Sequence, residues 1–388
     1  MKKDPASIMP SIMLMSLLSA FGAGSCMFII PIFAQDLGAS YIELGMIALI
    51  HSISYVLLVG IGGYLSDKKD CTQIMVIGLI LRIFSIGLLA IANTVFDIYL
   101  LSALGGMALG LFIPSSETLV LRINSKEDRI KSISSLNITF SIGMFIGPLT
   151  GGYIANIIGI RNLFQFSAVF TVISTIIAIL LISRNFVNEE IQTEPIKEGV
   201  KAMISQFKNM FMFILPYGAI FGNMIYIFPA YANSQGETLS TVGILILVFG
   251  IGRVIGSVIV NWMSKRGERF AIIISSIILI FSHFILTIDW TLSLIILSVF
   301  LIGNGIGIIF PIALSIITKR NESKNMGLTI GSFETLMVIG IAIGPPLSGF
   351  AAENISLNST FTVSTIMSVI LLLTGSKIFK ENKLEKKN

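Results

Sequence analysis

Charge is what this sequence has least of. Of its 388 residues only 47 are charged, 26 Lys and Arg and 21 Asp and Glu, a share of 12% that is about half of that in a soluble domain. Hydrophobic residues make up 54% of the chain before its 35 glycines are counted. This composition excludes both a soluble globular domain and an intrinsically disordered chain.

Cysteine and histidine are also scarce, with two of each. This excludes a disulfide scaffold, and no Cys-x-x-Cys pair or Cys/His cluster has the pattern of a zinc site. The phosphate-binding pattern Gly-x-x-x-x-Gly-Lys-(Ser/Thr) does not occur, so the chain does not itself use ATP. The hydrophobic runs hold no His/Asp/Glu cluster or Ser/Lys dyad at matched depth. We therefore expect no cofactor and no metal, and we expect that the protein is not an enzyme.

Long hydrophobic runs are abundant instead. A helix needs about 20 apolar residues to cross a hydrocarbon core of ~30 Å, and twelve runs of the sequence reach that length. Their approximate limits are 8–34, 41–65, 73–92, 98–121, 132–157, 162–183, 209–233, 240–263, 270–288, 292–318, 326–352 and 359–379. The sequence therefore predicts an all-α, multi-pass membrane protein with twelve transmembrane helices in the lipid bilayer.

Basic residues are distributed very unevenly between the two sides of the predicted membrane. Of the 26 Lys and Arg residues, 23 fall on one side, Arg161 alone falls on the other, and Arg82 and Arg253 lie within spans. Because cytoplasmic loops carry an excess of Lys and Arg, we expect both termini on the cytoplasmic side of the cell membrane. The net charge of +5 then reflects orientation, and no nucleic-acid partner is expected. The first run is too long for a signal peptide and is expected to be a retained helix.

One long polar segment interrupts the series of short loops. Residues 184–208 carry charges of both signs and one proline, a composition typical of a solvated linker. We therefore expect two bundles of six helices, at 1–183 and 209–388, joined by a cytoplasmic linker at 184–208.

The two halves repeat each other at a nearly constant offset. Glycines and prolines of spans four and five recur 197 residues later, and those near the first span recur 198 residues later. The pairs are Gly110/Gly307, Pro114/Pro311, Gly143/Gly340, Gly147/Gly344, Pro148/Pro345, Gly152/Gly349, Pro31/Pro229, Gly38/Gly236 and Gly45/Gly243. So many matches at one offset indicate a duplicated six-helix unit. Parallel repeats of this kind are typical of secondary transporters, whose substrate site lies at the repeat interface near the midplane.

A charged turn follows the second span. It reads Gly63-Tyr64-Leu65-Ser66-Asp67-Lys68 and resembles the loop motif Gly-x-Leu-(Ala/Ser)-Asp-(Arg/Lys) of the major facilitator superfamily. Gly63 would permit close helix approach, and the Asp67 carboxylate could face a helix N-terminus and hold one conformation electrostatically. The family's motif continues with Gly and two basic residues, where this chain has Asp70, Cys71 and Thr72.

Span four lies next to this turn in the predicted arrangement. Glu117, about four residues from its cytoplasmic end, is expected to pair with the Asp67/Lys68 turn or with Arg122, and substrate contact is the alternative. The same span resembles the family's Arg-x-x-Gln-Gly-x-Gly helix, but Ser102 and Gly105 occupy the places of Arg and Gln.

Span five carries a further family pattern. Its sequence from residue 143 to residue 152 resembles the Gly-x-x-x-Gly-Pro-x-x-Gly-Gly motif of the family's drug/proton antiporters, with Gly143, Gly147, Pro148, Gly151 and Gly152 at the motif positions. Glycines four apart form a smooth groove for helix packing, and a proline removes one backbone hydrogen bond and can kink the helix. We expect a bending point at the bundle interface, with plain glycine packing as the alternative. The resemblance implies the major facilitator fold, with two pseudo-symmetric bundles of six helices.

A few polar side chains lie within the spans, where a charge costs at least about 2.5–3.5 kcal/mol. Glu334 and Arg253 lie at matching depths, about 12 and 15 Å from the cytoplasmic side at 1.5 Å per residue. They are expected to form an ion pair or to face the same aqueous cavity, in a coupling role or a purely structural one. Asn137 occupies the repeat position of Glu334.

Further candidates for the substrate path are two amides and two aromatic side chains. Asn223 and Asn304 need hydrogen-bond partners in lipid surroundings and could line the path. Phe28 and Tyr226 are candidates for the substrate wall. The chain has 27 Phe and 17 Met residues, and a cavity surfaced by such side chains would suit bulky apolar or amphipathic substrates.

The sequence as a whole therefore favours a secondary active transporter that works as a monomer by alternating access. Export of amphipathic or hydrophobic small molecules against proton entry is the leading interpretation, because of the antiporter-like motif. Uptake of a small nutrient or organic anion by a symporter or uniporter is the alternative, since Arg253 favours an anion. A membrane receptor or scaffold that has kept a transporter fold without transport is the third interpretation.

Overall fold

The structure is a computed structural model that describes residues 8–68, 70–124, 128–182, 208–288, 291–320 and 326–385. Within these residues the chain is helical and contains no β-strand. The predicted linker lies outside the described residues except for Lys208.

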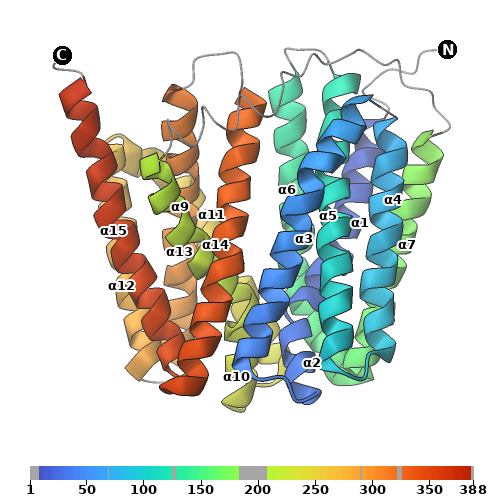
Figure 1. Cartoon of the computed structure of the whole chain (residues 1–388), viewed down its shortest axis with the longest axis horizontal. Coiled ribbons are helices and arrows are strands. Elements are labelled where there is room, and N and C mark those ends of the chain that lie inside the picture. The colour runs from blue at the N-terminus through green and yellow to red at the C-terminus, as the bar shows by residue number, and fades with distance from the viewer. Residues whose placement is uncertain are drawn as a thin grey trace. The chain divides into compact units, whose positions relative to one another are not determined.

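Within the described residues, the first half forms eight helical segments and the second half forms seven (Figure 1). Those of the first half are α1 (Met9–Met27), α2 (Ile30–Asp36), α3 (Tyr41–Lys68), α4 (Cys71–Gly87), η2 (Leu88–Ile91), α5 (Val95–Ile123), α6 (Arg129–Ile158) and α7 (Ile160–Ile182). Those of the second half are α9 (Lys208–Tyr226), α10 (Phe228–Ser234), α11 (Leu239–Ser264), α12 (Glu268–Ile288), α13 (Leu292–Arg320), α14 (Met326–Asn354) and α15 (Ser359–Glu385).

The described residues contain twelve helical spans that are long and apolar enough to cross a membrane. The predicted fold class is thereby confirmed, with some internal breaks. The first span is divided between α1 and α2 just before Pro31, and the seventh is divided between α9 and α10 just before Pro229. A proline lacks the backbone N–H that would continue the hydrogen-bond ladder. Because these prolines are 198 residues apart, the break is a feature of the repeat.

The chain divides into two compact units. The N-terminal unit comprises Met1–Ala39, Ile50–Thr193 and Ala232–Ile244, and the C-terminal unit comprises Ser40–Leu49, Glu194–Tyr231 and Leu245–Asn388. The first residues of α3, in the first half of the chain, therefore belong to the C-terminal unit. The first residues of α11, in the second half, belong to the N-terminal unit. These two helices are equivalent in the repeat, because α3 begins at Tyr41 and α11 begins 198 residues later, at Leu239.

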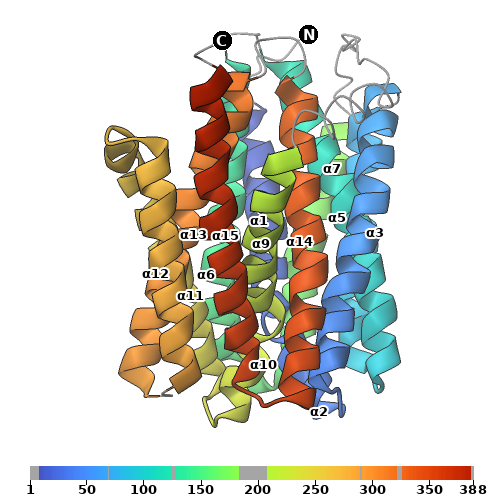
Figure 2. The same cartoon turned by 60° about the vertical axis from the view of Figure 1, so that its left-hand side comes forward.

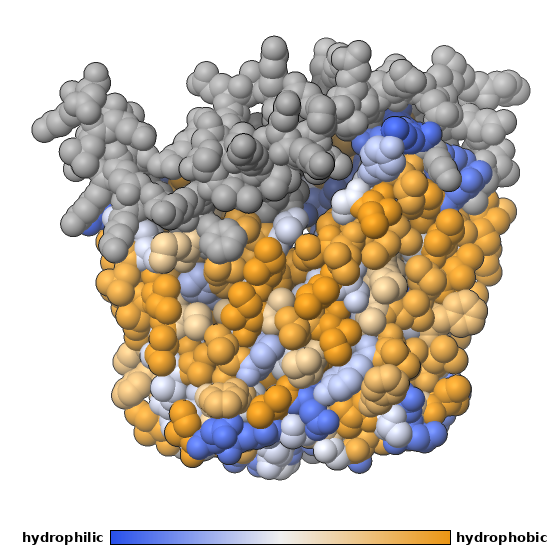
Figure 3. All heavy atoms as spheres, viewed as in Figure 1, coloured by the Kyte–Doolittle hydropathy of each residue, from blue (hydrophilic) through white to orange (hydrophobic). Residues whose placement is uncertain are grey.

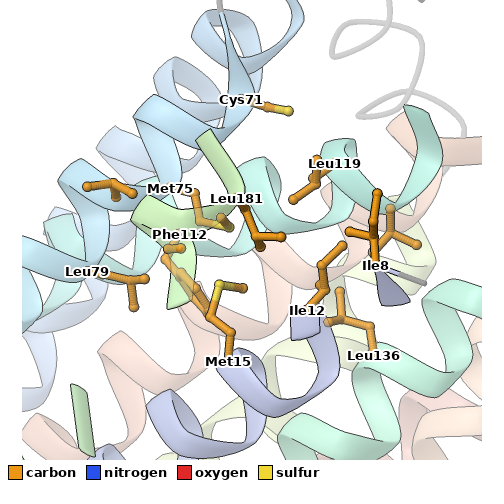
Figure 4. Packing of buried hydrophobic residues seen from close by; sticks show 13 residues of the cluster. Ile8, Ile12, Met15, Cys71, Met75, Leu79, Phe112, Leu119, Leu136 and Leu181 are labelled. Carbon is orange, nitrogen blue, oxygen red and sulfur yellow. The ribbon is translucent and has the colours of Figure 1, made fainter. Parts of the chain in front are cut away.

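In the N-terminal unit, a hydrophobic cluster joins α1, α4, α5, α6 and α7 (Figure 4). Its fully buried members include Ile12, Met15, Met75, Leu79 and Leu119. In the C-terminal unit, α9 packs against both α14 and α15, which lie beside it in Figure 2. Each unit thus has its own buried interior.

The glycines of the antiporter-like motif lie directly on α1. A Cβ atom added at Gly147 would lie 2.6 Å from the carbonyl carbon of Gly24, and one added at Gly151 would meet the carbonyl oxygen of Ser25. Gly143 faces α1 in the same way, with 2.8 Å from its ideal Cβ position to the Cβ of Ala20. These positions are four residues apart and therefore share one face of α6. The backbones of the two helices meet because no side chain separates them.

The C-terminal unit contains the same contact. Gly340 on α14, the counterpart of Gly143, faces Gly218 of α9, 2.8 Å from its ideal Cβ position to the Cα atom. The reciprocal contacts also match, since a Cβ on Gly24 would lie 3.0 Å from Met144 Cα and one on Gly222 would lie 3.0 Å from Ile341 Cα. The predicted repeat is thus present at the level of individual contacts.

On the surface of the units, many large hydrophobic side chains are exposed, whereas a soluble protein exposes mainly polar ones. Along α12, Ile277, Phe281, Phe284 and Ile288 are exposed at helical spacing, whereas Ser275, Ser276, Ser282 and His283 are buried on the other face. Hydrophobic residues cover most of the described surface seen in Figure 3, and hydrophilic residues gather near its lower edge. Exposed apolar side chains on one face of each span are what a lipid environment requires.

We expect Gly151→Ala to destabilise the protein by ~1–3 kcal/mol, the usual range for overpacking. Its new methyl group would meet the Ser25 carbonyl oxygen. Gly60→Ala is the matched control, because a Cβ at Gly60 of α3 has nothing within 4 Å. Thermal unfolding of the purified variants in detergent measures the effect, and equal melting temperatures for the two variants would contradict this packing.

Candidate functional site

A partly buried arginine of the C-terminal unit lies over two aromatic rings. The guanidinium carbon of Arg253, on α11, is 5.0 Å from the ring centroid of Phe221 on α9 and 6.0 Å from that of Phe310 on α13. Both distances are in the range of cation–π attraction, which strengthens where water is excluded. Three helices therefore hold one cation between aromatic faces.

Further aromatic side chains extend this cluster. The ring centroid of Phe310 lies 5.3 Å from that of Phe333 and 6.2 Å from that of Tyr217. Tyr217 is buried, and its hydroxyl has no hydrogen-bond partner among the residues that the structure describes. A buried hydroxyl of this kind can accept or donate a hydrogen bond to a bound molecule at little cost, because it is already desolvated.

Glu334 follows Phe333 on α14 and is partly buried. The contacts of Arg253 given above are with aromatic rings, and Glu334 is not among them. The ion pair or shared cavity expected from their matching depths therefore stays a prediction.

The two predicted amides are buried in the C-terminal unit. Asn223 Nδ2 donates a hydrogen bond of 2.9 Å to Ser364 Oγ on α15, while its Oδ1 has no partner within the described part of the chain. Asn304 is 7% exposed on α13, and its backbone carbonyl oxygen faces Gly256 of α11. Tyr226, at the end of α9, is also buried.

The predicted residues of the N-terminal unit are less closely associated. Phe28 is buried at the break between α1 and α2. Asn137, the repeat partner of Glu334, is exposed on α6. The structure therefore gives more support to a polar and aromatic cluster in the C-terminal unit than in this one.

The charged segment Gly63–Lys68, expected as a turn, forms the end of α3 and is held by an arginine that sequence reasoning did not place in the motif. Arg122 Nη2, at the end of α5, donates hydrogen bonds to the carbonyl oxygens of Ser66 (2.7 Å) and Asp67 (2.9 Å). A cation stabilises the carbonyl oxygens at a helix C-terminus. Lys68 is placed over the Tyr64 ring, 4.5 Å from Nζ to the centroid. Arg122 could have been found from the sequence as a base at the end of the neighbouring span.

The close helix approach expected at Gly63 occurs one residue earlier. A Cβ on Gly62 would lie 2.5 Å from the carbonyl oxygen of Gly110, whereas one on Gly63 would be 4.0 Å from the Cβ of Pro114. Glu117 lies on the same helix as Pro114 and is partly buried. The rotation of α3 about its axis directs Gly62, and not the motif residue Gly63, toward α5. The family motif therefore predicts where the two helices approach each other, but the glycine that makes the contact is its neighbour.

Comparison with known proteins places this architecture in a class of membrane transporters. The family model of the Major Facilitator Superfamily matches residues 12–233 and again residues 209–388. The chain belongs to the Major Facilitator Superfamily and is a multi-pass membrane transporter.

Among relatives by sequence, an uncharacterized MFS-type transporter of Methanocaldococcus jannaschii is 24% identical over 364 residues, which cover 90% of this chain and 92% of the relative. The purine ribonucleoside efflux pump NepI of Shigella dysenteriae is 23% identical over 80% of this chain and 79% of its own length. The quinolone resistance protein NorA of Staphylococcus aureus is 27% identical over 42% of this chain and 41% of its own.

Solved structures show the same fold at low sequence identity. The nucleoside transporter NupG superposes with a TM-score of 0.80 at 14% identity, over 96% of this chain and 99% of its own. A bacterial homologue of the human lysosomal transporter Spinster superposes with a TM-score of 0.76 at 12% identity, over 99% of this chain and 98% of its own.

We expect Asn223 and Ser364 to be energetically coupled by about 0.6 kcal/mol, the average for hydrogen bonds between transmembrane helices. A double-mutant cycle of Asn223→Ala and Ser364→Ala, measured by reversible unfolding in mixed micelles, gives this value. Thr374→Ala replaces Ser364→Ala in the control cycle, because the Thr374 hydroxyl bonds only within α15. Equal coupling in both cycles would show that the hydrogen bond does not form.

Proposed function

We propose that the protein is a secondary active transporter that exports amphipathic or hydrophobic small molecules by alternating access, driven by proton entry. The observation that carries this proposal is the cluster of Arg253 with Phe221 and Phe310. Aromatic faces bind planar apolar surfaces, and one cation with a buried hydroxyl supplies the few polar contacts that orient a ligand. Planar amphipathic molecules fit this chemistry.

Relatives support export. NepI is named as a purine ribonucleoside efflux pump and NorA as a quinolone resistance protein, and both names concern planar ring compounds. The glycine contacts of α6 with α1 agree with the antiporter-like motif, although α14 makes equivalent contacts with α9. The motif's role as a bending point remains part of the proposal.

Glu334 is the proposed proton carrier. It is a partly buried carboxyl group next to the aromatic cluster, adjacent in sequence to Phe333. A carboxyl group inside a membrane can gain and lose a proton as its surroundings change during transport. We also propose that both termini are cytoplasmic and that one chain forms the working unit.

Uptake of a small organic anion is the second candidate function. It is favoured by the positive charge of Arg253 among the aromatic rings, since a cation within a transport path attracts anionic substrates. The direction of coupling distinguishes it from export.

Transport by purified protein in proteoliposomes tests the function directly. We expect a lumen more acidic than the outside to drive accumulation of at least one compound in a panel of a quinolone, a purine ribonucleoside and a cationic dye. Antiport requires this direction, because protons leave as substrate enters. Accumulation driven by external acid would instead support uptake by symport. Correctly folded protein that moved no compound in either gradient would refute both candidates.

We expect Glu334→Gln to lower proton-driven transport at least ~10-fold, which corresponds to 1.4 kcal/mol, and to abolish its pH dependence. The amide cannot carry a proton but has nearly the shape of the carboxyl group. Glu237→Gln is the control, because it removes a carboxylate just before α11 and outside the spans. Unchanged transport and pH dependence in Glu334→Gln would exclude the coupling role.

A further inference from the structure

The N-terminal unit contains a buried positive charge that the proposed function does not use. Arg82 on α4 is 7% exposed, and its Nη1 has no hydrogen-bond partner within the described residues. It lies eleven residues after Cys71, where α4 begins, or about 16 Å along the helix at 1.5 Å per residue. The guanidinium group is therefore near the middle of a span, too deep for a lipid headgroup.

Polar side chains of two other helices lie within electrostatic range of this charge. The charge of Arg82 acts electrostatically on Cys26 of α1 and on His51 of α3. Cys26 is 1% exposed. The Cys26 thiol donates to the carbonyl oxygens of Gly22 (3.5 Å) and Ala23 (3.4 Å) on its own helix. An imidazole N–H can donate a hydrogen bond to a ligand, and neither group carries a negative charge at neutral pH.

Helices α3 and α4 both approach α5 at Gly105, which has no side chain. A Cβ on Gly105 would lie 2.8 Å from Ser85 Oγ and 3.7 Å from His51 Cδ2. Ser85 is three residues after Arg82 and so shares its face of α4. The Ser85 hydroxyl donates to the Leu101 carbonyl oxygen at 2.8 Å. Helices α3 and α4 therefore approach α5 closely at Gly105, and His51 lies beside the same glycine as Ser85, on the Arg82 face of α4.

Among the residues of this unit that the structure describes, no carboxylate lies at the depth of Arg82. The acidic residues that the structure describes here lie at or near helix ends: Asp36, Asp67, Asp70, Asp97, Glu117, Asp128 and Glu237. Within the described residues the structure therefore gives no protein carboxylate to neutralise the guanidinium charge. An arginine remains protonated in proteins, so the compensating charge has to come from elsewhere.

The internal repeat shows that the fold itself does not need this polar group. Arg82-Ile83-Phe84-Ser85 corresponds at offset 197 to Leu279-Ile280-Phe281-Ser282. At offset 198, His51 corresponds to Phe249 and Cys26 to Met224. The contacts confirm the register, because Gly106 meets the backbone of His51 and Gly303 meets that of Phe249. All three counterparts are buried and apolar.

We propose that Arg82, together with His51, binds a small anionic group in the middle of the N-terminal unit. Its chemistry is that of a monovalent anion, either free chloride or the carboxylate of a small organic acid. The planar guanidinium fork matches a carboxylate and also binds a halide, and the imidazole N–H supplies a second donor. The inference does not depend on the direction or the coupling of transport, because it concerns equilibrium binding.

Equilibrium binding of radiolabelled chloride and of radiolabelled benzoate to the full chain in lipid nanodiscs tests the site. We expect saturable binding of at least one of them, at least 10-fold weaker in Arg82→Leu and less affected in Arg82→Lys. Leucine is the residue at the repeat position and should be tolerated by the packing. Arg161→Gln is the charge-matched control, because Arg161 donates to the Ala90 carbonyl oxygen elsewhere in the unit, and we expect binding within 2-fold of the unmodified chain.

The two ligands separate the two sources of the anion. Binding of chloride alone identifies an inorganic anion site, and binding of benzoate identifies a site for an organic acid. The proposal is overturned if the unmodified chain binds neither ligand saturably, or if folded Arg82→Leu binds as the unmodified chain does. If Arg82→Leu does not fold, His51→Phe, which also copies the repeat, takes its place. We expect at least 3-fold weaker binding there, and unchanged binding would overturn the proposal.

Discussion

Backbone contact through glycine is the constraint on which each unit depends. In the N-terminal unit α6 lies on α1 with the carbonyl groups of Gly24 and Ser25 against Gly147 and Gly151, and α14 lies on α9 in the same way. Lipid provides little hydrophobic force between helices, so close packing of small residues has to hold them together. The same absence of side chains leaves interior positions where polar and aromatic groups can gather.

The internal repeat gives both units the same arrangement of helices, but the two units differ in the polar side chains at equivalent positions. Equivalent positions carry Tyr55 in the first copy and Arg253 in the second, and His51 in the first and Phe249 in the second. The C-terminal copy therefore presents a cation between aromatic rings, whereas the N-terminal copy buries Arg82 near His51 and Cys26. Because packing is the same in both copies, these differences point to ligand chemistry.

Much of the fold could be predicted from the sequence, because the length of an apolar run and the spacing of glycines are properties of the chain alone. The division of the first span before Pro31 was not predicted, although the proline was its signal. Helix rotation is harder to predict, so Gly62 makes the contact expected of Gly63. The rings around Arg253 come from α9 and α13, and no pattern in the sequence brings these two helices to it. Depth can be counted along a sequence, but the direction in which a side chain points depends on tertiary packing.

We propose that the two compact units, with their repeated interiors, move as bodies during transport. Double electron–electron resonance tests this motion by measuring the distance between two spin labels, one at Lys131 of the N-terminal unit and one at Arg269 of the C-terminal unit. The labels are attached to a chain whose two native cysteines are replaced. We predict two distance populations whose ratio changes with pH or substrate, and an unchanged distance for a control pair at Lys131 and Gln73 within one unit. A single inter-unit distance under all conditions, in protein that transports, would contradict the account.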